Sequence, residues 1–462
     1  MGELYKNAGL VPPAIADSAW DDLVSSAQTK KHVRNKGHAL FIAPIMPSDH
    51  GNGLAMRAGF LLDTYARVFR VDLAVIPIAG GELDITPFAN ERIRRWTVLP
   101  PQSPDTHFSL IRSVVDPDDR IAAFRLYGLP SSTAWLTNSL EASLKVWVEE
   151  TCYDLVHISR LYLSGLVSAF EKGTRKRPYL VLDCDEDDAR FYQQIAKLER
   201  RRGHERRARW AEAEAKGFKR LADQWVQRFD VLLASSTAEG RLLGERAGKA
   251  RVIVIPNVVP NNATTPLAKR AQSSRREILF VGNMSYAPNA DGVIWFASHV
   301  WPSLRSALPF PLRFIIVGSD PVRKVRELSK RPDIIVAGRV EDLRPIFSRA
   351  ALAVVPIWAA GGMRIKILEA AACGLPIVTT SIGAAGTGLR HRHELLVADH
   401  QRAFAAACVR MLTDRNFAFR IAMNARRRVR WESNPEHCAR RFYSLLNATA
   451  AGESSLQSSA IT

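Results

Sequence analysis

The chain has 462 residues, enough for two domains, with the 47% apolar and 24% charged content of an ordinary globular protein. Its five cysteines are scattered without a C-x-x-C pair, which excludes a disulfide framework and a cysteine-rich zinc site. The formal charge of +18 favours an anionic partner, such as a phosphorylated substrate, a membrane surface or nucleic acid, although a generally basic surface has the same composition.

Two further exclusions concern membranes and export. No apolar run approaches the ~18 residues that a membrane-spanning helix needs. The N-terminus lacks the basic start and apolar core of a signal peptide. We therefore expect a cytoplasmic protein, with peripheral attachment at the inner face of the membrane as a further option.

The first domain is expected at 37–260, after an N-terminal extension at 1–36 that shows no clear pattern. It opens with a strand at 38–45, a polar glycine loop, a helix at 54–69 and a strand at 71–78. Strand, glycine turn, helix and strand in this order are typical of a parallel α/β sheet. Further buried strands are predicted at 155–158, 179–183, 231–234 and 252–255.

The segment 190–228 stands apart because it holds twelve Lys or Arg and five Asp or Glu, with aromatic residues between them. Apolar residues at helical spacing predict two helices that are broken near Gly203. Three interpretations stay open: a solvated helical face, a surface beside an acceptor or an anionic membrane, and a nucleic-acid interface. The third lacks a recognised nucleic-acid-binding fold, so we expect no nucleic-acid partner.

A linker is predicted at 261–276, where Asn, Thr, Ser and Pro occur without apolar periodicity. The second domain is expected at 277–430, followed by a helix at 431–449 that packs back toward the first domain and a disordered tail at 450–462. Its strands are predicted at 278–281, 314–317, 334–336, 352–355, 377–379 and 395–397.

One motif in the second domain combines a glycine turn, an amphipathic helix, a Gly-Pro stop and a buried strand. Gly361 and Gly362 permit close approach of a diphosphate to the backbone, and the N-terminus of a helix attracts phosphate. Arg364 and Lys366 are expected in the first helical turn, with Glu369 on the same face. Anion-binding and hydroxyl-binding groups thus lie on one element, although solvent-facing charges on an amphipathic helix give the same pattern.

Several segments in order resemble the retaining, nucleotide-sugar-dependent glycosyltransferases of family GT4. The resemblance covers roughly residues 38–445. It is carried by the segments 154–158, 182–188, 229–236, 254–258, 280–289, 314–318, 338–340 and 361–378. It implies the GT-B fold, an α/β architecture in which two Rossmann-like doubly wound domains face a central cleft. The first domain would bind the acceptor and the second the donor nucleotide.

The chain departs from most of that family at two places. The position eight residues before Glu369, usually Glu, is Gly361. The usual basic pair after the first strand of the second domain is replaced by a loop with Asn283 and Pro288. A subgroup with the pattern Gly-Gly-x-Arg-x-Lys-x-x-Glu resembles the chain in both respects.

The resemblance also implies site residues. His157, Arg364 and Lys366 are expected to be catalytic, with His157 ending a central strand at the cleft. Ser159 is an alternative for that position, and a core histidine is another. The donor is expected to contact Gly51, Asn52, Gly53, Gly282, Tyr286, Asn289, Gly318, Arg339, Val340, Gly361, Gly362, Met363, Arg364, Lys366 and Glu369.

The resemblance implies transfer of a sugar from a nucleotide-diphosphate-sugar to a hydroxyl acceptor of a polysaccharide, a glycolipid or a related glycoside. No metal or redox cofactor is expected, although Asp183 and Asp185 form a D-x-D pattern that binds divalent metals in another glycosyltransferase fold. A catalytically degenerate protein that binds a nucleotide or a partner, a nucleotide-sugar epimerase, and a basic module for anionic surfaces remain alternatives.

Overall fold

The computed structural model describes residues 37–80, 83–170, 177–259, 277–340, 342–362 and 364–450. The N-terminal extension, the predicted linker, Met363 and the tail from 451 onward lie outside the described residues.

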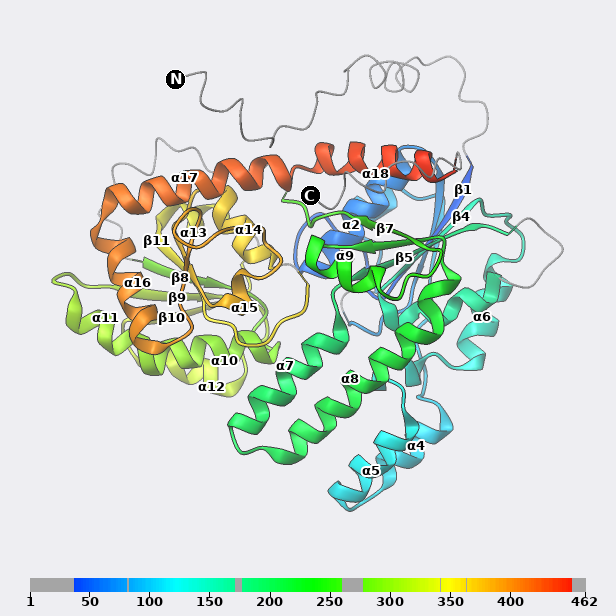
Figure 1. Cartoon of the computed structure of the whole chain (residues 1–462), viewed down its shortest axis with the longest axis horizontal. Helices are drawn as coiled ribbons and strands as arrows, with labels where there is room; N and C mark the ends of the chain where they lie inside the picture. Colours follow the sequence, from blue (N-terminus) through cyan, green and yellow to red (C-terminus); the bar gives the residue numbers. More distant parts are fainter. Residues whose placement is uncertain are drawn as a thin grey trace, which may run out of the picture. The chain divides into compact units, whose positions relative to one another are not determined.

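The first domain is built on a seven-stranded parallel sheet with the strand order β3-β2-β1-β4-β5-β6-β7. Figure 1 labels β1, β4, β5 and β7 of this sheet. The chain builds outward from β1 through β2 and β3, then returns to the other side of β1 for β4 and the rest. Such a reversal is a topological switch point, where ligands of α/β proteins bind at the carboxyl ends of the strands. The strands are β1 His38–Ala43, β2 Arg70–Val75, β3 Arg95–Val98, β4 Leu155–Ser159, β5 Tyr179–Asp185, β6 Val231–Ala234 and β7 Arg251–Val254.

The second domain repeats this plan with a six-stranded parallel sheet in the order β10-β9-β8-β11-β12-β13. Its switch point lies between β8 and β11. Two doubly wound sheets of this kind confirm the predicted α/β fold class. The strands are β8 Glu277–Val281, β9 Arg313–Val317, β10 Ile334–Gly338, β11 Ala350–Val355, β12 Ile377–Thr379 and β13 Leu396–Val397.

Helices connect the strands. The first domain holds α2 Gly53–Ala66, α3 Pro87–Asn90, α4 Thr106–Ser113, α5 Pro117–Tyr127, α6 Asn138–Val148, α7 Asp188–Arg201, α8 Glu205–Trp225 and α9 Thr237–Gly244. The second sheet is accompanied by α10 Ala287–Trp295, α11 Trp301–Ala307, α12 Arg323–Arg326, α13 Arg344–Arg349, α14 Ile365–Ala372, α15 Ser381–Ala384 and α16 Gln401–Thr413. The described chain ends with α17 Arg415–Glu432 and α18 Pro435–Ala450. Short 3-10 or π turns are η1 Ser131–Trp135, η2 Leu161–Phe170, η3 Val226–Arg228, η6 Phe296–Val300 and η7 Glu327–Lys330.

Each predicted strand overlaps a strand of the structure, and the predicted break near Gly203 separates α7 from α8. The sequence analysis missed β3, an edge strand in which Arg95 and Thr97 interrupt the apolar pattern. Because an edge strand is only half covered, it lacks the continuous apolar run by which the central strands were predicted.

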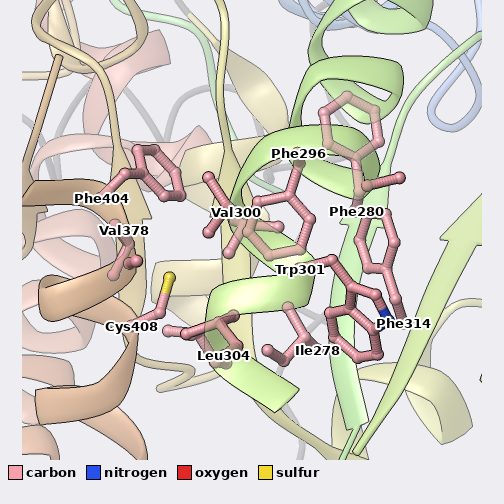
Figure 2. Packing of buried hydrophobic residues seen from close by; sticks show 14 of the residues in the cluster. Ile278, Phe280, Phe296, Val300, Trp301, Leu304, Phe314, Val378, Phe404 and Cys408 are labelled. Carbon is pink, nitrogen blue, oxygen red and sulfur yellow. The ribbon is translucent and has the colours of Figure 1, made fainter. Parts of the chain in front are cut away.

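Aromatic packing fixes the second sheet against its helices. Figure 2 shows Phe296 and Trp301 beside Phe314 of β9, with ring centroids 4.7 and 5.7 Å from the Phe314 ring. The indole nitrogen of Trp301 donates a 2.8 Å hydrogen bond to Asp333, so its polar atom is satisfied inside the core. This packing holds β8 and β9, whose carboxyl ends carry Gly282 and Gly318.

The last two helices each pack on an element that starts at a candidate site. Ala425 and Val429 of α17 share a buried cluster with Ile367 of α14. Phe442 of α18 meets Tyr65 of α2 edge to face at 5.5 Å. The helices α2 and α14 are thus held along their length, which leaves their N-termini in fixed positions.

Candidate functional site

The predicted donor motifs follow the strands at the two switch points. The glycine loop at 51–53 comes after β1, and Ser159 ends β4. Gly282 follows β8 directly, and the pair Gly361 and Gly362 follows β11. Because carboxyl ends of parallel strands gather at one edge of a sheet, each domain presents its motifs at one ligand-binding edge.

The glycine pair shapes the entry to α14. Gly362 has a φ of 57°, in the left-handed region that glycine adopts without strain. The helix itself begins at Ile365, and Arg364 is its N-cap residue rather than part of the first turn. The prediction that both basic residues lie in the first turn is therefore wrong for Arg364, because the glycine turn extends one residue further.

Arg364 is a buried cation, with 8% of its surface exposed. Its guanidinium donates hydrogen bonds to the carbonyl oxygens of Gly361 at 3.0 Å and Ile382 at 2.6 Å, while its Nε has no hydrogen-bond partner. Within the described ranges no carboxylate lies at ion-pair distance from it, and burial lowers its pKa. A buried guanidinium without a carboxylate at ion-pair distance, beside a helix N-terminus, is a site prepared for an anion, although Glu239 and Glu186 attract it from farther away.

Lys366 lies in the first turn of α14, as predicted, and points toward the end of β8. Its Nζ donates a 2.6 Å hydrogen bond to Oδ1 of Asn289 and lies 4.7 Å from the centre of the Phe280 ring. A Cβ built on Gly282 would stand 2.5 Å from this Nζ, so glycine keeps the ammonium accessible. Burial lowers the pKa of Lys366 to about 7 and raises the pKa of Glu369 to about 7.

The backbone around Gly282 is packed too closely for side chains. A Cβ on Gly318 would lie 2.7 Å from the carbonyl carbon of Gly282 and closer still to its oxygen. The Asn289 amide donates to the Asn283 carbonyl at 2.7 Å, which orients its oxygen toward Lys366. The structure therefore brings Gly282, Gly318, Asn289 and Lys366 together, as the donor-site prediction requires.

Other predicted donor residues lie around this group. Tyr286 is 41% exposed and stacks on Phe191 of α7 with ring centroids 6.1 Å apart. Arg339 and Val340 follow β10, the edge strand that lies two positions from β8.

The glycine loop of the first domain meets α14 directly. Asn52 caps α2 by accepting a 2.9 Å hydrogen bond from the Ala55 amide. A Cβ on Gly53 would touch Cδ1 of Ile365 at 3.0 Å. The N-termini of α2 and α14, each with unpaired N–H groups, thus converge on one point.

His157 does not face a cleft, which corrects the prediction for its position. Its side chain is fully buried, stacked 4.3 Å from Phe41 and hydrogen-bonded to Ser159 at 3.0 Å and Tyr65 at 3.3 Å. Burial lowers its pKa to about 3, so the ring is neutral. Since β4 is covered on both faces, its apolar pattern gave no sign of which face the histidine occupies.

The D-x-D residues belong to a buried ion pair. The guanidinium of Arg57 in α2 binds Asp183 through Nη2 at 2.7 Å and Nε at 2.8 Å. Nη1 of the same arginine donates to Asn257 at 2.9 Å, and Nε lies 3.5 Å from Asp185. Asp183 therefore already has a cationic partner, the guanidinium of Arg57. Among the described residues, no group of three or more His, Cys, Asp or Glu is arranged to hold a metal ion.

A second ionic cluster, which sequence analysis missed, surrounds Arg160. This residue follows β4 with a φ of 77°, and its guanidinium pairs with Glu186, with Asp188 at 2.7 Å and with Asp185 at 3.4 Å. Burial raises the pKa of Asp188 to about 8. The acidic run at 183–188 could have indicated this cluster, because several neighbouring carboxylates that are buried require a cationic partner.

The same acidic loop lines a cavity of about 350 Å³ in the first domain. Its walls come from the start of α7, from α8 and from α9. They include Glu239, whose carboxylate accepts a 2.6 Å hydrogen bond from Ser235 and whose pKa burial raises to about 7. An acidic, partly apolar cavity beside the strand ends suits a ligand that is rich in hydroxyl groups.

Comparison with known proteins adds to this geometry. Residues 275–414 match the family model "Glycosyl transferases group 1". An uncharacterized 44.6 kDa protein from the cps region of Klebsiella pneumoniae is 28% identical over 156 residues, which make up 32% of this chain and 40% of that protein. Most of the second domain is therefore similar to a glycosyltransferase group 1 domain.

Solved structures extend the likeness to both domains. Sucrose-phosphate synthase from Thermosynechococcus elongatus superimposes with a TM-score of 0.62 at 16% identity, over 90% of this chain and all 100% of the other. Anabaena HepE, solved in complex with UDP and glucose, gives a TM-score of 0.59 at 14% identity, over 89% and 100% of the two chains. The chain has the GT-B fold of these proteins.

No helix in the described part of the chain is long and apolar enough to cross a membrane.

Proposed function

We propose that this protein transfers a sugar from a nucleoside diphosphate to a hydroxyl group of an acceptor, with retention of the anomeric configuration. The observation that carries the proposal is the buried Arg364, which lies at the N-terminus of α14 and has no carboxylate at ion-pair distance among the described residues. A diphosphate brings negative charge to Arg364 and accepts hydrogen bonds from the free N–H groups at the start of the helix. The group 1 domain and the UDP complex of HepE support a sugar nucleotide as its source.

The proposed chemistry stabilises charge on the leaving diphosphate, which takes up the proton that the acceptor hydroxyl loses as the new glycosidic bond forms. When the bond between sugar and β-phosphate breaks, negative charge grows on the phosphate. Arg364 and Lys366 are held in place by Gly361, Ile382 and Asn289, so they stabilise this charge without reorganising. These two cations take the role that a metal ion has elsewhere, and we propose metal-independent transfer on that ground.

We propose the remaining contacts to the donor from the positions of the other residues in this group. Glu369 lies one turn after Lys366 on α14, where its carboxylate accepts hydrogen bonds from ribose hydroxyls. Gly318 and Gly282 carry no side chains, so their backbones lie close together, and we propose that the diphosphate binds beside them. We propose membership of the GT4 subgroup with the Gly-Gly-x-Arg-x-Lys-x-x-Glu pattern on this basis.

The acceptor is proposed to belong to a polysaccharide, a glycolipid or a related glycoside, with peripheral attachment to an anionic membrane on the cytoplasmic side. Leu110, Val115 and Leu126 on and between α4 and α5 are 62%, 88% and 87% exposed. Part of the neighbouring positive charge is already neutralised, since Arg206 and Arg209 of α8 pair with Asp118. Sedimentation with anionic and neutral vesicles at low and high salt tests this attachment, which requires binding to the anionic vesicles alone.

The enzymatic proposal is tested by incubating the protein with UDP-, GDP- and dTDP-sugars, with and without EDTA, and following release of the nucleoside diphosphate. We expect slow hydrolysis of one donor that persists in EDTA and is lost in Arg364→Ala. Conversion of the donor sugar into an epimer, seen by NMR, would instead identify an epimerase. Absence of both reactions with every donor, or strictly metal-dependent release, would contradict the proposal.

A further inference from the structure

We propose that Glu186, from the first domain, is the carboxylate that binds the sugar of the donor beside Gly361. This inference rests on the proposed function and deepens it, because it assigns a specificity-determining residue to the sugar rather than to the diphosphate.

The first observation is the reason why residue 361 is a glycine. Gly361 does not have a positive φ, unlike Gly362, so its backbone would accept a side chain. A Cβ at this position would nevertheless lie 3.0 Å from Cγ and 2.6 Å from Cδ of Glu186, and closer still to Oε2. The space where a side chain of residue 361 would begin is thus occupied by the Glu186 carboxylate.

The second observation is that this carboxylate is held in place. Its Oε1 pairs with Nη2 of the buried Arg160 guanidinium, and the same nitrogen also pairs with Asp188. Its Cβ packs 3.1 Å from the position of a Cβ on Gly362. A carboxylate that is anchored through one oxygen presents the other to the glycine turn, where it can accept a hydrogen bond.

The third observation is that Glu186 contacts both the glycine turn and a cavity. Gly361 also accepts the hydrogen bond from Arg364, the proposed diphosphate ligand. Glu186 also lines the 350 Å³ cavity of the first domain. Glu186 therefore stands between the phosphate-binding turn and that cavity. In a sugar nucleotide this is the place of the sugar, whose hydroxyl groups are donors for a carboxylate oxygen.

The test compares Glu186→Gln with the wild type and with Glu150→Gln, an exposed carboxylate that does not line the cavity. Calorimetry uses the tightest-binding sugar nucleotide of the UDP, GDP and dTDP panel and its free diphosphate. We expect Glu186→Gln to weaken binding of the sugar nucleotide and its turnover by about 10- to 100-fold, the usual loss for a charged hydrogen bond. Binding of the free diphosphate should stay within about twofold, and Glu150→Gln should match the wild type.

A charge-relocation experiment adds a readout that a purely structural role would not move. Gly361→Glu alone should be inactive, because its side chain collides with Glu186. Glu186→Ala with Gly361→Glu removes the collision and returns a carboxylate to the turn, so it should turn over faster than either single variant. Thermal unfolding of each variant checks that it is folded.

The outcomes separate the two proposals. Failure of the wild type to bind any nucleotide would overturn the proposed function itself. A wild type that binds and turns over its donor, with a Glu186→Gln variant that keeps the wild-type preference for sugar nucleotide over free diphosphate, would overturn only the role of Glu186. A double variant less active than Glu186→Ala would do the same.

Discussion

The charge of Lys366 depends on what occupies the site. In the empty protein, burial lowers its pKa to about 7, and its nearest polar partner is the neutral amide of Asn289. A diphosphate beside it favours the charged ammonium, so binding raises this pKa. At alkaline pH, Lys366 must therefore take up a proton when the diphosphate binds, and this protonation adds to the free-energy cost of binding.

This coupling predicts that donor binding takes up protons. At about pH 8 the free Lys366 is mostly neutral, so binding of a nucleoside diphosphate should consume up to about one proton and weaken as pH rises. Calorimetry in buffers of different ionisation enthalpy measures the uptake. Lys366→Met should remove the uptake, and an unchanged proton count in that variant would contradict the assignment.

The buried position of His157 predicts a pH-dependent stability rather than a role in catalysis. Its pKa is about 3 in the folded state and ~6.5 in an unfolded chain. Its contribution to the free energy of unfolding is therefore fully present above pH ~6.5 and is lost as the pH falls toward 3. The expected loss is about 1.4 kcal/mol per pH unit below ~6.5. His157→Gln should therefore show a shallower fall of stability with acid than the wild type in denaturant titrations. The exposed His299→Gln serves as control, and equal slopes in all three proteins would refute this account.

At the level of single residues, the sequence predicted well where one short segment carries the whole motif. Lys366, Glu369 and the two glycines lie within nine residues. The prediction failed for partners that are distant along the chain. Arg57 pairs with Asp183, which lies 126 residues further along the chain, and the local sequence around either residue does not indicate this pair.

At the level of elements, the Arg57–Asp183 pair joins α2 to β5. The side chains of both residues are nearly inaccessible, and Asn257 accepts a further hydrogen bond from the same guanidinium. A buried charge that loses its partner cannot be compensated by water. This pair thus ties the first glycine loop's helix to the strand that leads into the acidic loop.

Asp183→Asn should accordingly destabilise the first domain by up to about 3–5 kcal/mol, since it leaves the buried Arg57 charge with only Asp185 at 3.5 Å. Chemical denaturation measures the loss. Asp187→Asn, a change in the N-cap residue of α7, should cost less than about 1 kcal/mol, because Asn caps a helix about as well as Asp. Mg²⁺ or Mn²⁺ should not shift the melting temperature of the wild type. A metal-dependent shift that Asp183→Asn abolishes would revive the metal-binding interpretation of the D-x-D pattern.

Elements were predictable because the central strands are continuous apolar runs and the helices are periodic. Their ends were less so. The boundary of α14 depends on the left-handed Gly362, which moves Arg364 from the first turn to the cap. That one-residue difference changes the function of the side chain, because a capping arginine bonds backward to Gly361 instead of pointing along the helix.

At the level of the whole molecule, described contacts from α7 and its C-cap residue to the second domain include the stacking of Phe191 on Tyr286 and two polar contacts. Gln194 accepts a 3.0 Å hydrogen bond from the amide of Ala360, immediately before the glycine turn. Arg202 pairs with Asp291 at 3.0 Å, with both side chains about one-third exposed at 34% and 33%. The first contact adjoins the donor site, and the second lies at a solvated rim.

These two contacts should differ in their effect on donor binding. Gln194→Ala leaves the amide of the buried Ala360 unpaired and loosens the turn, so the affinity for the donor should fall about 5- to 10-fold. Arg202→Ala removes an exposed ion pair and should change it by less than about threefold. Equal effects in calorimetric titrations would mean that the turn is not positioned by α7.

The central claim is that Arg364 and the N-terminus of α14 form the diphosphate site of a metal-independent sugar transferase. Isothermal titration of the wild type and of Arg364→Ala with UDP, GDP and dTDP in EDTA tests it most directly. We predict that the wild type binds one of these nucleotides and that Arg364→Ala binds it about 100-fold more weakly or not at all. Equal affinity in the two proteins, or binding that requires a divalent metal, would contradict the claim.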